Sequence, residues 1–322
     1  MRKRAVSITT AVVLAALLVE AGRGVRAQVS AFPRAQAVYE QAWNHAEKRL
    51  FDEICTRLKK YWNLRSSDPA ADLERTGLKR ELLAFVAGRR SDWQTWRSFP
   101  DGSGEVQIRV PLGEISAFLQ GAGRRMGWGS NAADAFRVRA FVKLAGDDDL
   151  FAHAVGMGLP RSVSTPARPA PFWKKESSNA QADAERAAYD DASKDLWGRI
   201  QKLPVGPDLY VQAFLEGFPD RAENLRQLLR REFDRGKSPT RYLPGGICEV
   251  DIFLDLDDLR KSIEQVALFS SPERSPWRAI DLEYLYAGAG GRRMIYATGV
   301  SYSRFHEPGE GPAWRSRELK AD

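Results

Sequence analysis

Histidine and cysteine are scarce in this 322-residue chain, which has three histidines and two cysteines. Two cysteines are too few for a thiolate zinc site, and the histidines lie in three different predicted elements, without the paired spacing of an HExxH metalloprotease. SxxK motifs are absent, and the sequence around Ser130, GWGSN, lacks the closing glycine of a nucleophile elbow. We therefore expect no metal and no other cofactor. A hydrolase would need a triad scattered along the chain, built on His45, His153 or His306.

Long apolar runs are equally scarce, and the clearest one, Ala5 to Val19, directly follows three basic residues. Val25-Arg26-Ala27 then offers the small residues that signal peptidase reads. The pattern predicts a secretory signal peptide over residues 1–27, cleaved after Ala27. The run is too short to favour a permanent membrane span, and an uncleaved anchor is the alternative. Because no cysteine lies near the cleavage site, we expect a periplasmic or secreted protein without a lipid anchor.

The net charge of the chain is small when residues 1–27 are left out of the count. The whole chain has a formal charge of +7, and residues 1–27 hold five basic and one acidic side chain, so the remainder carries +7 − 4 = +3. Much of the net positive charge therefore belongs to the predicted signal peptide, and the charge does not imply a nucleic-acid partner. The hydrophobic content of 43% is that of a folded protein, and the length suffices for two domains.

One stretch of 19 residues occurs twice, as RSFPDGSGEVQIRVPLGEI from Arg97 and as RYLPGGICEVDIFLDLDDL from Arg241. The two copies align without a gap and share seven identical residues, where chance would give roughly one. Each copy begins with Pro and Gly turn residues, continues as an alternating strand, and ends in a short helix. The sequence therefore predicts one structural unit used twice.

The flanking segments extend each unit in the same order. Helical periodicity is found over residues 36–63 and again 146 residues later, and a second helix follows in each half, near 73–87 and 222–233. Alternation then predicts a second hairpin in each unit, from strands 136–142 and 151–156 in the first and 280–286 and 295–299 in the second. Each unit thus reads helix, helix, hairpin, helix, hairpin, an α+β domain with helices packed on an antiparallel sheet.

Composition places the boundaries between these segments. Proline, serine and alanine dominate the region between the two halves, and proline and glycine precede a charged end. We expect a signal peptide over 1–27, a first unit over 28–159, a Pro-rich linker over 160–180, a second unit over 181–306 and a disordered tail over 307–322.

The chain resembles the LPP-twenty lipoprotein family in two motifs, FPDGSGEV to VPL in the first copy and RYLPGG in the second. That family is similar to the amino-terminal domain of the flagellar assembly protein T. AAYDDA at 187–192 and YATG at 296–299 also look like that family's helix and strand. The resemblance implies a non-enzymatic envelope protein with an assembly or surface role, and no catalytic residues. This chain departs from the family in lacking the lipid-bearing cysteine and in doubling the domain.

Few residues are candidates for a site. Trp93 and Trp96 lie three apart on the expected first strand, with Arg89, Arg90 and Arg97 nearby, and could form an aromatic-basic patch for a glycan or protein. Core packing is the competing interpretation.

The cysteines and the acidic residues give two further candidates. Cys55 and Cys248 form either a disulfide joining the two halves or two separate buried thiols. The acids Asp251, Asp255, Asp257 and Asp258 lack the spacing of a calcium loop and are expected at outward strand positions and a helix start.

Three functions follow from these observations. The first is a non-catalytic envelope protein that assembles with another envelope protein. The second is a module that binds peptidoglycan or another polysaccharide, and the third is a secreted hydrolase. The sequence leaves the partner, the process and the oligomeric state open.

Overall fold

The computed structural model describes residues 33–62, 68–128, 131–147, 149–160, 170–268 and 275–303. The predicted signal peptide and tail, together with Ser130 and His306, lie outside these residues. The chain divides into two units, residues 1–164 and 165–322. Helices packed on small antiparallel sheets make up both units, which confirms the predicted α+β class.

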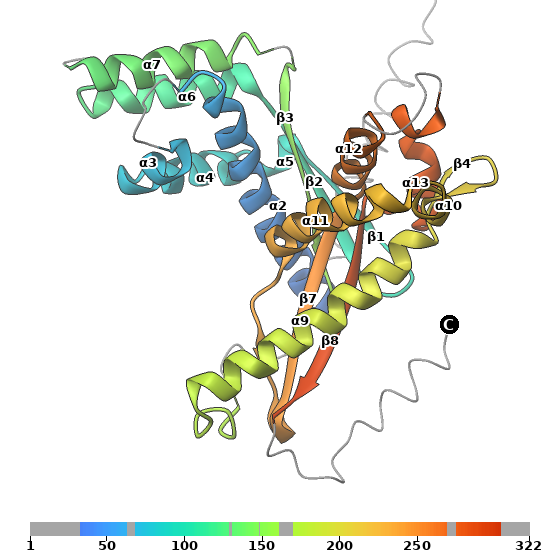
Figure 1. Cartoon of the computed structure of the whole chain (residues 1–322). Helices are drawn as coiled ribbons and strands as arrows, with labels where there is room; N and C mark the ends of the chain where they lie inside the picture. Colours follow the sequence, from blue (N-terminus) through green and yellow to red (C-terminus); the bar gives the residue numbers. More distant parts are fainter. Residues whose placement is uncertain are drawn as a thin grey trace, which may run out of the picture. The chain divides into compact units, whose positions relative to one another are not determined.

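Unit 1 is built on a three-stranded antiparallel sheet in the order β1-β2-β3. Helices flank these strands and are labelled in Figure 1. In chain order the elements are α2 (Pro33–Lys59), α3 (Pro69–Arg75), α4 (Leu78–Gly88), α5 (Arg90–Trp93), β1 (Gln94–Ser98), β2 (Gly104–Pro111), α6 (Leu112–Arg125), α7 (Ala132–Leu144) and β3 (Phe151–Gly158).

Unit 2 has a sheet in the order β6-β7-β8 and a separate two-stranded ribbon of β4 and β5. Its elements are α9 (Ser178–Gln201), β4 (Pro204–Gly206), β5 (Leu209–Tyr210), α10 (Val211–Gly217), α11 (Pro219–Gly236), β6 (Arg241–Tyr242), the 3-10 turn η1 (Pro244–Gly246), β7 (Ile247–Asp255), α12 (Leu256–Ala267), the 3-10 turn η2 (Pro276–Arg278), α13 (Leu282–Gly288) and β8 (Met294–Tyr302).

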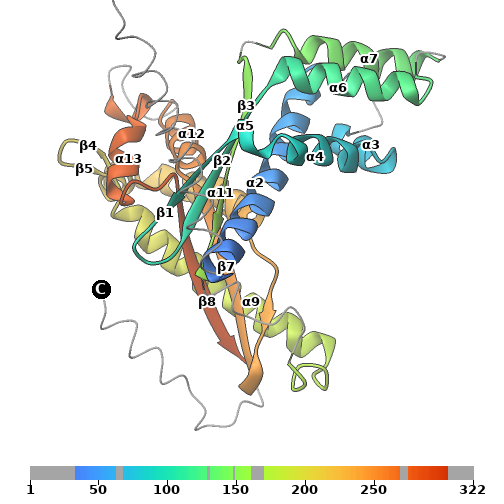
Figure 2. The same ribbon diagram turned by 180° about the vertical axis from the view of Figure 1, so that it is seen from behind.

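A long helix lies across the sheet of each unit, α2 against β3 and α9 against β8 (Figures 1 and 2). Close approach is possible because glycine and alanine meet at the contact. A Cβ on Gly156 would overlap the backbone of Ala42 and Ala46, and one on Gly299 would overlap Ala188 and Ala192. The small residues let the backbones touch, and the helix buries the sheet face that the alternating strand residues form.

The same helices bind the free edges of β3 and β8 through side chains. The Met157 amide donates to Nδ1 of His45 at 3.2 Å, and the Leu159 amide donates to Oε1 of Gln41 at 2.8 Å. In unit 2 the Val300 amide donates to Oδ2 of Asp191 at 3.0 Å. Edge strands carry unpaired backbone donors that attract other chains, and these helices satisfy part of them.

The second hairpin predicted in each unit is wrong in its first strand. Residues 136–142 lie in helix α7, and residues 280–286 lie largely in helix α13. Each helix has an N-cap that the alternation concealed: the Asn131 side chain accepts from the Asp134 amide, and the Asp281 side chain accepts from the Glu283 amide. Val142, an inward residue in the predicted strand, is 51% exposed. The short window of alternating residues could not distinguish the two periods.

The predicted linker also differs from the structure in its second half. Residues 161–169 lie outside the described part of the chain, but Trp173 is 1% exposed and belongs to the core of unit 2. Its indole Nε1 donates to the carbonyls of Leu243 and Ile247 at 2.9 and 3.1 Å. Helix α9 then starts at Ser178, inside the range expected to be extended.

Candidate functional site

The two tryptophans singled out from the sequence lie on different elements. Trp93 is the last residue of α5, not a strand residue as predicted, while Trp96 lies in β1. The Trp93 ring makes an edge contact with Phe85 at 5.6 Å, and the Trp96 ring makes one with Tyr39 at 5.2 Å. Trp96 also covers Gly104, where a Cβ would overlap the indole. Both rings are half-buried against the core of unit 1.

Two of the three neighbouring arginines are already engaged within unit 1. The Arg89 guanidinium lies 5.1 Å from the Trp93 ring and pairs with Glu114. Arg90 lies 4.2 Å from the Trp43 ring and pairs with Glu40 at 3.0 Å. Arg89 thus packs on Trp93, whereas Arg90 packs on Trp43 and not on Trp96, so the arrangement fits separate packing better than one shared binding patch.

His45 is held as an acceptor rather than as an acid or base. Nδ1 receives the Met157 amide proton, so the ring must be unprotonated at that nitrogen. Burial, together with the positive charges of Arg49 and Lys48, lowers the pKa of His45 to about 3. Burial and the nearby Arg109 and Arg57 also lower the pKa of His153, which lies on β3.

Both cysteines are free and buried, each in the hydrophobic cluster of its own unit. Burial raises the pKa of the Cys55 thiol to about 12 and that of the Cys248 thiol to about 11. Thiols with such high pKa values are almost fully protonated at neutral pH, and the protonated form is a poor nucleophile. The structure therefore has two separate buried thiols where a disulfide was the alternative.

Asp251 and Asp255, both expected at outward positions of the strand, make hydrogen bonds within unit 2. Asp251 is fully buried, pairs with Arg241, and accepts a hydrogen bond from Thr298 Oγ1 at 2.6 Å. Asp255 is the N-cap of α12, and its carboxylate accepts the Asp257 amide at 2.9 Å. Two-sided burial of β7 explains the first difference, because an outward position on this strand is not a solvent position.

Unit 1 has comparable ion pairs. Asp72 is 2% exposed and accepts from Arg137 Nε at 2.5 Å, which links α3 to α7. Asp147, in the turn that follows α7, is buried beside Arg57 at 3.5 Å. Among the described residues, no group of three or more His, Cys, Asp or Glu side chains is arranged to hold a metal ion.

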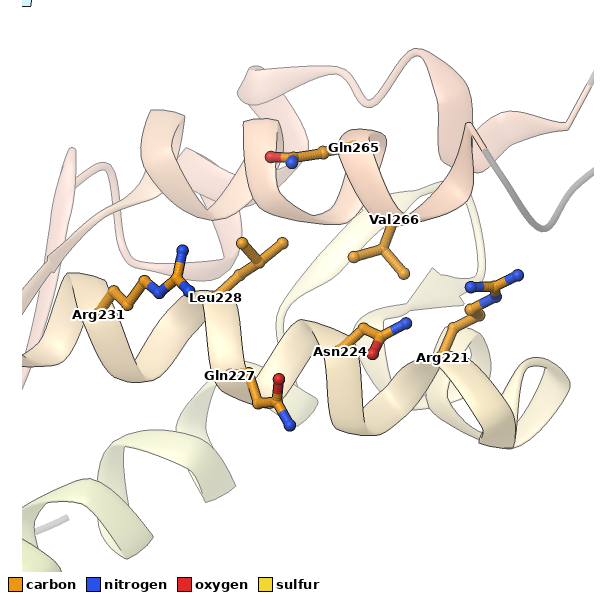
Figure 3. Close-up of a pocket in the computed structure, with 7 residues that line it drawn as sticks. All are labelled: Arg221, Asn224, Gln227, Leu228, Arg231, Gln265 and Val266. Atoms are coloured by element: carbon orange, nitrogen blue, oxygen red, sulfur yellow. The ribbon is translucent and has the colours of Figure 1, made fainter.

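Helix α11 of unit 2 is bordered by two surface recesses, and neither was predicted from the sequence. The first lies between α11 and α12, has a volume of about 250 Å³, and is shown in Figure 3. Amide side chains line much of it, and Arg221 and Arg231 lie toward its opposite ends (Figure 3). Its lining comprises Arg221, Asn224, Gln227, Leu228, Arg231, Gln265 and Val266.

The second recess, which we call the basic-aromatic groove, lies between α9 and α11 and has a volume of about 260 Å³. Three aromatic rings and three cations line it, accompanied by one serine and one aspartate. The residues are Tyr189, Asp190, Ser193, Lys194 and Trp197 of α9, and Arg226, Arg230 and Phe233 of α11. Spacings of four residues, as from Tyr189 to Ser193 to Trp197, place each set on one face of its helix.

The cations of this groove are largely uncompensated. Lys194 and Arg230 form no ion pair with any residue in the described part of the chain. Arg226 lies 5.4 Å from the Trp197 ring and makes only a long contact of 3.5 Å with Glu223. Asp234, four residues after Arg230 on α11, accepts a hydrogen bond from Tyr189 Oη at 2.5 Å.

Unit 1 has corresponding contacts between α2 and α4, but there the rings are covered. Lys79 lies 5.0 Å from the Phe51 ring, as Arg226 lies over Trp197. Trp43 and Phe51 are each 3% exposed, whereas Tyr189 and Trp197 are half-buried. An offset of 146 residues, as between the two long helices, pairs Ser193 with Glu47, and an offset of 147, as between Arg226 and Lys79, pairs Arg230 with Leu83.

These two differences mark the groove in the sequence, because Ser193 is smaller than Glu47 and Arg230 places a charge where unit 1 has an apolar leucine. The repeat alignment could have shown it, had the two halves been compared for their differences as well as their identities. The further signal is the pair Arg226 and Arg230, four residues apart on one helix.

Comparisons with known proteins add no relative. Neither the protein-family models, nor the curated proteins, nor the solved structures contain a match to this chain.

Proposed function

We propose that the protein is a non-catalytic component of the bacterial cell envelope, periplasmic or secreted, that assembles with another envelope protein. The observation that carries this proposal is the basic-aromatic groove, where half-buried rings lie beside three cations, two of which, Lys194 and Arg230, form no ion pair among the described residues. Such a surface offers apolar contact and charge for binding. The signal-like first 27 residues and the resemblance to LPP-twenty proteins support the envelope location.

The roles of the histidines argue against a hydrolase. Neither His45 nor His153 lines either recess of unit 2. His45 already accepts a backbone hydrogen bond, and a pKa of about 3 makes its ring a weak base. A general base in the groove would have to be Asp190, three residues before Ser193, and no histidine among the groove residues completes a triad.

Glycan binding is the second candidate, and half-exposed Trp96 is its remaining support. Its ring shares its faces with Tyr39 and Gly104, so a sugar would have only the uncovered part on which to stack. The groove of unit 2 is also poor in hydroxyl and amide partners for sugars, since its lining has no amide side chain and its two hydroxyls are those of Ser193 and of Tyr189, which already donates to Asp234. We therefore favour a protein partner.

A pull-down from cross-linked envelope tests the proposal. The tagged full chain is expressed with its own first 27 residues and compared with the Trp93→Ala/Trp96→Ala double variant. We expect a discrete envelope protein to be recovered equally by both. Recovery of glycan alone, lost in the double variant, would establish the glycan-binding alternative. Absence of the protein from the envelope and secreted fractions would refute the location as well.

A further inference from the structure

We propose that the basic-aromatic groove binds an acidic amphipathic helix of a partner protein. The inference rests on the proposed function and deepens it by naming the chemistry of the partner. It begins from the shape of the groove, which residues 189–197 of α9 and 226–233 of α11 line from two sides. Grooves between helices receive a third helix through anchors spaced three or four residues apart.

The length of the groove fits such an occupant. Tyr189 and Trp197 are eight residues apart on α9, which corresponds to about 12 Å along a helix, or a little over two turns. Two apolar side chains of a partner helix, seven or eight residues apart, would therefore meet the two rings. Phe233, which is 5% exposed, supplies an apolar floor between them.

The charges select acidic residues on that helix. Lys194, on α9, and Arg230, on α11, are both exposed, and neither has an ion-pair partner in the structure's described residues. Arg226, one turn before Arg230, adds a third cation on the α11 side. Glutamates or aspartates flanking the apolar anchors would pair with these side chains, while basic flanks would be repelled.

In unit 1 the corresponding rings, Trp43 and Phe51, are buried. Glu47 and Leu83 of unit 1 stand where unit 2 has Ser193 and Arg230, and a hydrogen bond joins the Glu47 carboxylate to the Trp43 side chain. Arg90 lies 4.2 Å from the Trp43 ring and Lys79 5.0 Å from the Phe51 ring, and both rings are buried. In unit 2 the shorter serine and the outward arginine leave the rings accessible, and we attribute this opening to ligand binding.

Fluorescence anisotropy with a synthetic peptide tests the inference on the purified full chain. The probe is a labelled 18-residue peptide with leucine along one helical face and glutamate elsewhere. A second peptide of the same composition, in an order that cannot form an amphipathic helix, controls for charge alone. Polygalacturonate, an anionic glycan, is the competitor that represents the other class of ligand.

The decisive variant is Lys194→Glu/Arg230→Glu, which reverses both unpaired cations of the groove. The matched control is Arg221→Glu/Arg231→Glu, which makes the same change of charge in the recess between α11 and α12. Circular dichroism establishes that both variants are folded. We expect the groove variant to weaken peptide binding about tenfold, because two exposed pairs change from attraction to repulsion, and the control by no more than about twofold.

Several results would overturn the inference. These are no binding of the helical peptide, equal loss in both double variants, equal binding of the reordered peptide, or polygalacturonate binding that the peptide cannot displace. If the groove variant still recovers the envelope partner in the pull-down, the groove is not the contact, although the proposed assembly function stands. If no partner is recovered by any form of the chain, the proposed function itself fails.

Discussion

Acidification should destabilise unit 1 through His45, the residue that caps the edge of β3. Folding lowers its pKa from 6.5 to about 3, so the unfolded chain binds more protons than the folded one between these two pH values. Stability is therefore fully present above pH 6.5 and is lost as pH falls toward 3. The physical reason is that a protonated Nδ1 cannot accept the Met157 amide and would place a charge beside Arg49.

The size of the effect follows from the two pKa values. At pH 5 nearly every unfolded molecule carries a proton on His45, while almost no folded molecule does. Linkage then gives a loss of about 2 kcal/mol between pH 7 and pH 5. The result depends little on how far the folded value lies below pH 4.5, because the unfolded state sets the proton uptake in this range.

Urea unfolding at pH 7 and pH 5 measures this loss, with His45→Asn as the comparison. Asparagine keeps an acceptor near the position of Nδ1 and does not titrate. The carboxylates are common to both proteins, so the difference between their pH slopes isolates His45. His153→Asn is the control for the second histidine whose pKa is lowered. If wild type and His45→Asn lose the same stability between pH 7 and pH 5, the assigned role of His45 is wrong.

Three further predictions concern packing and burial. Gly156→Ala should cost about 2 kcal/mol or more, because its Cβ would overlap the backbone of α2, whereas Gly198→Ala should gain about 0.5 kcal/mol, since no atom lies within 4 Å; chemical denaturation of both variants decides. Cys55 and Cys248 should react with a thiol reagent only after unfolding without reductant, and a fully unreactive unfolded chain would mean that they are bridged. Asp72→Ala should cost about 2 kcal/mol, because it removes the buried carboxylate that links α3 to Arg137 and leaves Arg137 with Asp134 alone; a loss below about 0.5 kcal/mol would contradict that role.

Sequence reasoning found the elements whose signals are local. The strand β2 was predicted from alternation and the turn before it from Pro100 and Gly102, whose φ is +80°. Long helix α2 was found from its apolar face, within a few residues at each end. These signals hold because each element buries one face regularly.

The predictions that were wrong concern residues whose environment is set by tertiary contacts. Asp251 has the pattern of an outward strand residue, and only the covering of the second face of β7 makes it buried. The first turn of α7 depends on the Asn131 cap, which a window over 136–142 does not include. Trp173 looked like part of a linker, since its hydrogen bonds reach residues about 70 positions away. The basic-aromatic groove likewise depends on two helices that are distant in sequence.

Within the described residues, no helix is both long enough and apolar enough to span a membrane.

Photo-cross-linking in living cells tests the proposed contact of the groove most directly. A photoreactive residue is placed at Lys194, on the rim of the groove, and for comparison at Gln227, in the recess between α11 and α12. We predict a discrete adduct with an envelope protein from position 194, mapping to an acidic helical segment, and none or far less from position 227. Adducts of equal yield from both positions, or adducts with glycan only, would contradict the account.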